Sequence, residues 1–479
     1  MQWLTNSWYG GNATDQFVGT SNSFQSSKNV EIRQESKALK LQKRPVRNAS
    51  AVVLDWVNKF VTIQSTGDVI AFGNAGKIYR QAAGTGSFAL AYTDSSARNI
   101  SDAYEYNSYL YWATPTHLHR IAVSSIDASW SGDVTEDYKT FSQGTSSHHP
   151  MLEVYNDLYV GDGKYVAKLD SFLVFTGTTL SIFADEQIVG ITFNGTSMSL
   201  YSQRTASVPY SRKYMWNGLS DSYNEFVHFE GKTIHAVQNM GTVDYVLAGR
   251  MPSLYAIQGY SLQQVKALPD FADGDSATFN HNAMCAQEDN VLFCTVASGT
   301  TSINRGVWSL GSKDKDYPVS LNNDYTTTNA SSSDLVSTVH YSNGKVYLAW
   351  KNGSTYGIDV TDNTLYAASG EVVSRAWDGQ MGWQKKEFVS LKLSFKTLAA
   401  GEQIDVYLRR NLASSWGSAV LTAAYSDAAD QSINYKELLS TLEPFNFLES
   451  KVVLTCGTSG LTTPAVLDMI ITSEPIEVN

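Results

Sequence analysis

One structural pattern recurs along the middle of the chain at a nearly constant spacing. Each occurrence has an alternating apolar strand, a tight turn with Asn, a second apolar or aromatic strand, and a third strand after Gly or polar residues. Asn suits such turns because a two-residue hairpin loop needs positive φ, which Asn, Asp and Gly adopt most readily. The turn asparagines are 49, 49, 38, 45, 51 and 53 residues apart: Asn58, Asn107, Asn156, Asn194, Asn239, Asn290 and Asn343.

Three or four antiparallel strands every forty to fifty residues is the spacing of a β-propeller blade. Neighbouring blades stack and bury each other's faces, and circular closure leaves only short edges. We therefore predict an all-β protein with a β-propeller of about seven blades over residues 51–380. A β-solenoid, or several sandwiches that share only the hairpin pattern, are the alternatives. The third strands are predicted at Lys77–Arg80, Leu118–Ala122, Tyr165–Leu169, Lys213–Trp216 (the weakest), Leu254–Ile257, Val307–Leu310 and Tyr356–Val360.

Both ends of the chain depart from this pattern. Residues 381–479 are predicted to form a C-terminal β-sandwich domain, joined through Gly379–Lys385. Its predicted strands are Glu387–Phe395, Gln403–Arg409, Ser418–Tyr425, Ser450–Thr455 and Val466–Thr472, with one helical turn at Asn434–Ser440. Residues 1–50 are predicted to be an extended N-terminal arm with short strands at Asn29–Arg33 and Leu39–Gln42. The arm has too few apolar residues to fold alone, so it must lie on its own ring or on a neighbouring copy.

Charge is distributed unevenly. The whole chain has a net charge of −11, whereas residues 1–50 hold seven basic and three acidic residues, net +4, which leaves −15 for the rest. The excess of acidic over basic residues disfavours general binding of double-stranded DNA, because phosphate contacts need clustered Lys and Arg. A basic arm on an acidic body is suited to docking on a neighbouring copy, with chance fluctuation over fifty residues as the alternative. Deletion of residues 1–50 is then expected to leave a folded monomer.

No specific catalytic or cofactor-binding arrangement is found, so we predict no enzyme activity and no catalytic, cofactor-binding or metal-binding residues. His117 and His119 share one face of a strand, but a metal site there needs further ligands, and ordinary strand histidines are favoured. The GTSG string at Gly457–Gly460 is one residue short of a nucleophile elbow, and GNAGK at Gly73–Lys77 lacks the spacer of a phosphate loop. Asp270, Asp273 and Asp275 do not match the calcium-loop spacing, which favours a solvated acidic turn.

Aromatic and carboxylate residues leave two further functions open. Carboxylates at the centre of a propeller serve glycosidases, but the sequence identifies no pair. Trp and Tyr can form sugar platforms, yet four tryptophans fall on predicted strands and are expected in the core: Trp56, Trp112, Trp308 and Trp350.

The three cysteines cannot build a disulfide framework. Cys285 and Cys294 flank Asp289-Asn290 symmetrically and would face each other in a tight hairpin, so a bridge is conceivable, although two reduced strand cysteines are favoured. The apolar runs are too short to span a bilayer, and the N-terminus lacks the features of a signal peptide, so membrane insertion is not expected.

The N-terminal stretch resembles a known family. It has Gly10-Gly11, a Phe/Ser segment, Ser27–Arg33 (SKNVEIR), and a basic exit at Arg44-Pro45. In this order it resembles the N-terminus of bacteriophage virion β-propeller proteins of the tail nozzle or tail-hub type. The segment Leu391–Arg410 is similar to β-sandwich modules of such proteins. The likeness covers about sixty residues, and seven units depart from nozzle rings with six blades per subunit.

The resemblance implies a structural function in the tail of a virion assembled in the host cytoplasm. It implies a homo-oligomer, possibly a hexameric ring, that contacts other tail or neck proteins and forms part of the DNA exit channel. The acidic body would let genomic DNA pass without specific binding, so replacing lumen acids with Lys is expected to slow DNA ejection. The alternatives are a tail adhesin that binds a carbohydrate or a host receptor, such as a host-surface glycan, and a propeller glycosidase.

Overall fold

The computed structural model describes residues 1–5, 8, 10–11, 13, 23–32, 38–48, 55–143, 148–204, 210–230, 233–249, 253–267, 276–277, 280–288, 290–295, 297–298, 306–311, 320–329, 331, 334–425, 433–439 and 442–476. These residues form a β-propeller-like all-β fold made largely of four-stranded antiparallel sheets. Two compact units are distinguished by their internal contacts. Unit 1 comprises residues 1–45, 308–326 and 361–479, and unit 2 comprises residues 46–307 and 327–360.

Five sheets of unit 2 are each built from four consecutive strands, in chain order. The first two sheets are β6 (Val57–Thr62), β7 (Val69–Gly73), β8 (Lys77–Gln81), β9 (Ala89–Thr93), and β10 (Asp102–Tyr106), β11 (Tyr109–Ala113), β12 (His117–Ala122), β13 (Thr135–Thr140). The next three are β14 (Met151–Val154), β15 (Asp157–Asp162), β16 (Tyr165–Leu169), β17 (Phe175–Ser181); β18 (Glu186–Phe193), β19 (Met198–Arg204), β20 (Tyr210–Trp216), β21 (Glu225–Glu230); and β22 (Ile234–Met240), β23 (Val243–Ala248), β24 (Ser253–Gln258), β25 (Ser261–Ala267).

Two more sheets follow along the chain. One has the order β27 (Met284–Gln287), β28 (Asn290–Thr295), β30 (Gly306–Gly311), β31 (Ser320–Tyr325). The other has the order β32 (Leu335–Ser342), β33 (Lys345–Asn352), β34 (Thr355–Tyr366), β5 (Lys43–Asn48), so its last strand comes from the N-terminal part of the chain. A two-stranded sheet pairs β26 (Ser276–Ala277) with β29 (Ala297–Ser298), and two short 3₁₀ turns are η1 (Ala82–Gly84) and η2 (Val123–Ser125).

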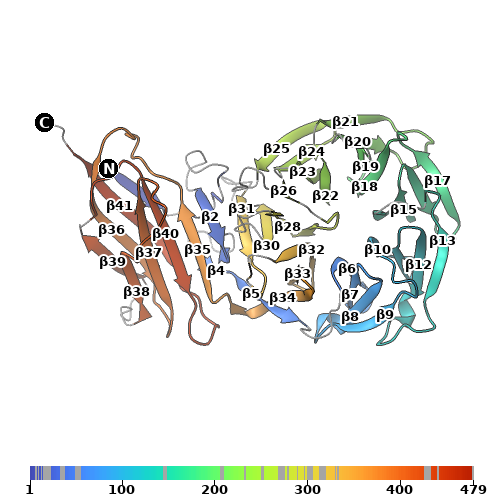
Figure 1. Ribbon diagram of the computed structural model, residues 1–479, viewed down its shortest axis with the longest axis horizontal. Coiled ribbons are helices and arrows are strands. Elements are labelled where there is room, and N and C mark those ends of the chain that lie inside the picture. The colour runs from blue at the N-terminus through green and yellow to red at the C-terminus, as the bar shows by residue number, and fades with distance from the viewer. Residues whose placement is uncertain are drawn as a thin grey trace. The chain divides into compact units, whose positions relative to one another are not determined.

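The first strands of these sheets form a closed circuit within unit 2. Each of β6, β10, β14, β18, β22, β27 and β32 contacts the next, and β32 returns to β6 (Figure 1). Apolar cores lie between successive sheets. One is formed by Phe72 and Ile78 of the first sheet with Leu110 and Trp112 of the second. Stacking of this kind buries both faces of each sheet, which one sheet alone cannot do.

The strand β5 joins the seventh sheet to the first. The guanidinium of Arg47 donates a hydrogen bond to the backbone oxygen of Tyr356 at 3.2 Å and lies over the ring of Trp350. Asn48, the last residue of β5, donates to the backbone oxygen of Gly86 at 2.8 Å and accepts from the backbone N–H of Phe88 at 2.9 Å. One side chain therefore bridges the two ends of the circuit.

Replacing Asn48 with Ala is expected to lower the free energy of unfolding by about 1–2 kcal/mol, because two hydrogen bonds across the junction are lost. Urea denaturation measures the change, with Asn224→Ala at an exposed asparagine as the matched control. Equal stability of the Asn48 and Asn224 variants would show that this bridge does not stabilise the junction.

Unit 1 contains two larger sheets that share one apolar core. The first has the order β1 (Gln2–Thr5), β41 (Val466–Pro475), β36 (Lys386–Lys396), β39 (Ile433–Leu439), and the second β2 (Phe24–Lys28), β35 (Ser369–Ser374), β40 (Leu448–Thr455), β37 (Gln403–Arg410), β38 (Leu421–Ala424). A short sheet pairs β3 (Val30–Glu31) with β4 (Lys40–Leu41). Their common core includes Leu391, Ile404, Val452 and Ile471.

The N-terminal segment, which the sequence predicts to be an extended arm, contributes strands and buried side chains to this core. Strand β1 pairs with β41, and β2 pairs with β35. The side chains of Trp8, Phe24, Val30, Ile32 and Leu39 are each at most 4% exposed within the core of unit 1. The apolar residues of the segment are few, but strands more than 300 residues away supply the rest of their core. The domain boundaries predicted after residues 50 and 380 stay predictions, and the compact units divide at other residues.

Most of the predicted strands are confirmed, with a few exceptions. All seven predicted third strands coincide with β8, β12, β16, β20, β24, β30 and β34. The predicted helical turn at Asn434–Ser440 is wrong, because this segment is the strand β39 and pairs with β36. Asn107, Asn156, Asn194 and Asn343 lie in hairpin turns as predicted, whereas Asn58, Asn239 and Asn290 lie in strands.

The predicted facing of Cys285 and Cys294 is also wrong. In the hairpin of β27 and β28, Gln287 pairs with Asn290, so Cys285 lies opposite Leu292. The turn falls one residue earlier than the sequence indicated, and the register shifts with it. Cys285 is a free thiol, as favoured from the sequence, and Cys456 is free as well. Three of the four tryptophans expected in the core, Trp112, Trp308 and Trp350, are at most 1% exposed.

Candidate functional site

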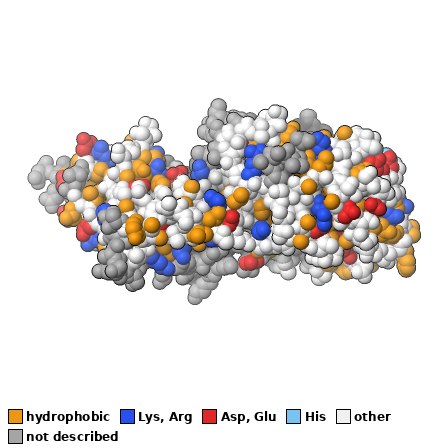
Figure 2. Space-filling model, turned by 90° about the horizontal axis from the view of Figure 1, so that it is seen from below, with side chains coloured by type: hydrophobic (Ala, Val, Ile, Leu, Met, Phe, Trp, Pro, Cys, Tyr) orange, Lys and Arg blue, Asp and Glu red, His pale blue; other side chains and the backbone are white. Residues whose placement is uncertain are grey.

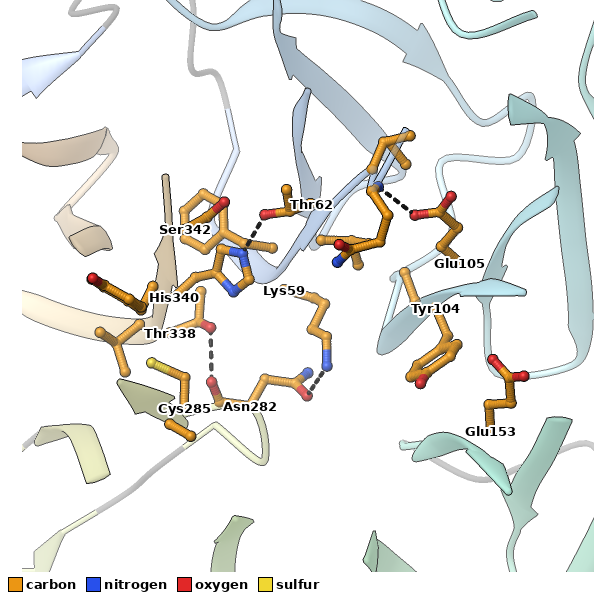
Figure 3. Close-up of a pocket in the computed structure, with 18 of the residues that line it drawn as sticks. Lys59, Thr62, Tyr104, Glu105, Glu153, Asn282, Cys285, Thr338, His340 and Ser342 are labelled. Atoms are coloured by element: carbon orange, nitrogen blue, oxygen red, sulfur yellow. Dashed lines mark hydrogen bonds between the residues drawn. The ribbon is translucent and has the colours of Figure 1, made fainter. Parts of the chain in front are cut away.

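A cavity of about 820 Å³ lies at the centre of the circuit in unit 2. Its wall comes mainly from the first strands of the sheets, including β6, β10, β27 and β32, and from the turns that follow them (Figure 3). Each strand reaches the centre because it is the innermost strand of its sheet. The cavity volume lies within the ordinary range of about 300–1,000 Å³ for ligand pockets. Polar side chains dominate the lining.

One wall of the cavity is acidic. Tyr104, Glu105 and Glu153 lie near one another on β10 and β14 (Figure 3). The carboxylate of Glu105 accepts a hydrogen bond from the backbone N–H of Gln64 at 2.8 Å. Burial raises the pKa of Tyr104, and the charge of Glu153 raises it further. The phenol therefore stays protonated at neutral pH and presents a neutral aromatic ring between two carboxylates.

The opposite wall is neutral. His340 of β32 is hydrogen-bonded to the hydroxyl of Thr62 on β6 at 2.8 Å (Figure 3). Burial, followed by the positive charge of Lys59, lowers the pKa of His340 to about 4. Burial also raises the pKa of the Cys285 thiol to about 12. Both groups are therefore uncharged at neutral pH.

Lys59 does not offer a free positive charge to the cavity. Its ammonium group lies 2.7 Å from the carboxylate of Asp102, which is 5% exposed. The same ammonium donates to the side-chain oxygen of Asn282 at 3.3 Å (Figure 3). Asp102 compensates the charge of Lys59, so Glu105 and Glu153 leave the described lining with a net negative charge.

A short segment of the chain, Asn280–Ala283, crosses the centre of the circuit; we call it the hub segment. It leads into β27, yet its hydrogen bonds reach other sheets. Asn280 donates to the side chain of Asn58 at 3.0 Å, and Asn282 donates to the backbone oxygen of Ser101 at 2.9 Å. The backbone oxygen of Asn282 accepts from Thr338 at 2.7 Å. These bonds connect the hub segment to the first, second and seventh sheets.

Histidines hold the hub segment to two more sheets. The ring of His281 stacks on His148, which precedes β14, with centroids 4.5 Å apart. Its Nδ1 also lies 2.9 Å from the backbone oxygen of His235 on β22. Burial lowers the pKa of His281 to about 4 and lowers that of His148 well below its ordinary range. Two neutral rings can stack closely, whereas two imidazolium ions would repel each other.

Acid is expected to destabilise unit 2 before its carboxylates are protonated. Burial holds the pKa of His119, His281 and His340 near 4 in the folded state, below the ordinary value of about 6.5. The unfolded chain then binds more protons between pH 6.5 and 4, so the free energy of unfolding falls as pH falls through that window. At about 1.4 kcal/mol per pH unit for each group, these three groups alone give a slope of about 4 kcal/mol per unit. Burial lowers the pKa of His148, His149 and His235 as well, which adds to the slope in the same direction.

Urea denaturation between pH 7 and 4.5 measures this slope. His340→Gln is expected to reduce it by about 1.4 kcal/mol per pH unit, while Asn224→Ala, at an exposed side chain that does not titrate, is expected to leave it unchanged. A stability that does not vary between pH 6.5 and 4.5 would contradict the prediction.

Neither histidine of the His117/His119 pair lines this cavity, whereas Cys285 and the turn residues Asn107 and Asn343 do. His117 and His119 share a face of β12 as predicted, and both lie near Asp137, with nitrogen–oxygen distances of 3.5 and 3.8 Å. His119 is fully buried and stacks on Trp112. Within the described residues, no group of three or more His, Cys, Asp or Glu side chains is arranged to hold a metal ion. Asp270, Asp273 and Asp275 lie outside the described residues.

The two near-motifs are ordinary connections. Gly73–Lys77 forms the turn between β7 and β8, and Gly457–Gly460 follows β40. The cavity residues carry no motif, since they come in short runs, such as Lys59–Gln64 and Ala103–Ser108, from strands spread over almost 290 residues. The propeller pattern itself is the only sequence signal that places their strands around one centre.

Comparisons with known proteins identify no family for this chain. No family model matches the chain, and no curated protein matches it. Among solved structures, the extracellular domain of a putative hybrid two component system from B. thetaiotaomicron is similar with a TM-score of 0.45 and 12% identity, over 77% of this chain and 44% of that one. The chain thus corresponds to less than half the length of that protein.

Two smaller structures are similar over nearly their whole length. The Neurospora crassa Pan2 WD40 domain has a TM-score of 0.44 and 8% identity, over 70% of this chain and 98% of that one. The computationally designed Ika8 protein has a TM-score of 0.42 and 9% identity, over 66% of this chain and 99% of that one. None of these likenesses carries an argument about function. Among the described residues, no helix has the length and apolar character needed to cross a membrane.

Proposed function

We propose that this chain is a non-enzymatic structural protein of a bacteriophage virion, of the tail nozzle or tail-hub type, and that unit 2 is a seven-bladed β-propeller. In this proposal several copies form a ring in the tail, contact other tail or neck proteins, and together surround the path of the exiting DNA. The virion assignment rests on the resemblance of the N-terminal stretch from Gly10 to Pro45.

The observation that carries the proposal is the position of the strand that ends this stretch. The basic-Pro exit, Arg44-Pro45, lies within β5, which is the fourth strand of the sheet formed by β32, β33 and β34. A strand from the start of the chain then completes the last blade, and Asn48 connects it to the first. Such closure supports a rigid block, because β5 adds a second connection between the two ends of the circuit beside the contact of β32 with β6. A rigid block suits a component that bears load in an assembly.

The distribution of surface charge supports passage of DNA without binding. On the face drawn in Figure 2, the described Lys and Arg side chains are scattered among acidic and hydrophobic ones rather than gathered into one basic patch. Duplex binding requires clustered cations that displace the counterions of the phosphates. The net charge of −11 acts in the same direction.

Measurement of the assembly state of the full-length chain tests this proposal. Mass photometry and negative-stain imaging at micromolar concentration are expected to reveal a closed symmetric oligomer. If basic residues of the N-terminal stretch dock on acidic copies, the double variant Lys28→Glu, Arg44→Glu should dissociate it, whereas Lys385→Glu should not; all three side chains are exposed. A chain that stays monomeric at every salt concentration would contradict a ring-forming role.

A further inference from the structure

The central cavity of unit 2 is closed on one side by the hub segment. Asn282 lies in the cavity wall, and the segment around it is bonded to Asn58, Ser101, Thr338 and His235 on four different sheets. Lys59 and Asp102 form an ion pair beside it. The centre of the circuit is therefore a pocket with a polar floor, and Gln64 and Asn107, which follow the first strands β6 and β10, are part of its lining.

The charges in this pocket exclude anionic ligands. The ammonium of Lys59 is already compensated by Asp102 at 2.7 Å, and His340 is neutral. The carboxylates of Glu105 and Glu153 remain in the wall, and Glu153 is exposed to the cavity. A phosphate or sulfate group placed there would meet two like charges at close range, where the effective dielectric constant is below that of water.

The neutral amide side chains of the pocket distinguish between cationic amines and ligands that carry hydroxyl groups. Gln64, Asn107, Gln238 and Asn343 contribute side-chain amides, which both donate and accept hydrogen bonds. Three of them use an N–H within the protein: Asn107 to Ser171, Gln238 to Asn239 and Asn343 to Gly67. Each of the four amides has a carbonyl oxygen that can accept and two N–H groups that can donate, so the use of one N–H within the protein leaves a second one. A protonated amine on a ligand would use only the acceptors of the pocket, whereas a hydroxyl group both donates and accepts.

The aromatic ring of Tyr104 adds an apolar face beside these polar groups. It lies in the wall between Glu105 and Glu153 (Figure 3). An aromatic face favours a ligand whose C–H groups lie on one side and whose hydroxyls lie around the edge, because the ring removes apolar surface from water. A sugar ring has this distribution of groups.

From these observations we propose that the central cavity is a binding site for a neutral oligosaccharide, with Tyr104 as the stacking surface and Glu105 and Glu153 as acceptors for its hydroxyls. The site goes beyond the structural function proposed above and does not depend on it. A chain that forms no ring could still bind the sugar, and a ring-forming chain could fail to bind it.

The experiment begins with the full-length chain on a printed array of neutral and acidic oligosaccharides. The neutral glycan with the strongest signal is then titrated by calorimetry, beside spermidine as a cationic probe and inorganic phosphate as an anionic one. We expect saturable binding of the neutral glycan and no binding of phosphate.

Three variants locate the binding. Tyr104→Leu is expected to weaken the affinity by about tenfold or more, and Glu153→Gln by about three- to tenfold. Asp133→Asn, at an exposed carboxylate outside the lining, is the matched control and should bind like the parent chain. Urea denaturation confirms that each variant is folded.

Each other outcome overturns the proposal. Binding of spermidine alone, lost in Glu153→Gln, would make the cavity a site for cations. Glycan binding that both cavity variants leave unchanged would place the site elsewhere on the chain. No binding of any array glycan at millimolar concentration would show that the cavity holds only solvent.

Discussion

Deleting residues 1–50 is expected to abolish the cooperative folding of unit 1 instead of leaving a folded monomer. The deletion removes the strands β1 to β5, and with them six side chains of the apolar core: Trp8, Phe24, Val30, Ile32, Leu39 and Leu41. At about 1.5–3 kcal/mol for each buried side chain, the loss is on the order of 10 kcal/mol, which is comparable to the whole stability of a domain.

Thermal unfolding followed by circular dichroism, together with amide hydrogen exchange, measures this effect. A synthetic peptide of residues 1–50 added to the truncated chain should restore part of the transition, because the segment is held by noncovalent packing. A truncated chain that unfolds as cooperatively as the full chain would show that the segment is a separable arm, as the sequence alone suggested.

Replacing Lys213 with Met is expected to lower the free energy of unfolding by about 3–5 kcal/mol. Lys213 on β20 and Asp244 on β23 form an ion pair at 3.1 Å between two neighbouring sheets, and both side chains are only 2% exposed. Asp244 also accepts hydrogen bonds from the hydroxyl of Tyr201 at 2.6 Å and the amide of Asn239 at 2.8 Å. Without Lys213, a buried carboxylate is left with no compensating cation.

A double variant tests this cause. Lys213→Met combined with Asp244→Asn should recover part of the lost stability, because the second change removes the buried charge and keeps a hydrogen-bond acceptor for Tyr201. Asp185→Asn is the control. The side chains of Asp185 and Arg204 are 49% and 42% exposed, so their ion pair should contribute less than about 1 kcal/mol. If the double variant is less stable than Lys213→Met alone, the penalty does not come from an isolated charge.

Strands were the most predictable part of this fold. Apolar alternation in the sequence predicts the third strand of every repeat. This includes Lys213–Trp216, which lies far from its turn. In the first repeat the hairpin differs from the prediction, because Asn58 lies within strand β6 and not in a turn. Its amide instead donates to Asn99 at 2.9 Å and to the backbone oxygen of Ile100 at 3.1 Å. An Asn whose local preference is for a turn can thus occupy an inner strand when distant groups satisfy it.

Contacts between distant segments were beyond the reach of the sequence. The N-terminal residues looked too polar to fold, and only their pairing with β35 and β41 explains their burial. The helical turn expected at Asn434–Ser440 is a strand because the neighbouring β36 supplies its hydrogen bonds. Likewise, Glu105 and Glu153 carry no motif, and only the circular arrangement of β10 and β14 brings them to one wall.

The hub segment also restricts what can move through this molecule. Asn280–Ala283 runs across the axis of unit 2 and is tied to the sheets around it. A linear polymer such as a nucleic acid strand cannot thread the middle of a single copy unless those ties break. Any conduit that this protein helps to build must therefore have walls made from the outer surfaces of several copies, and its bore is set by how many copies assemble.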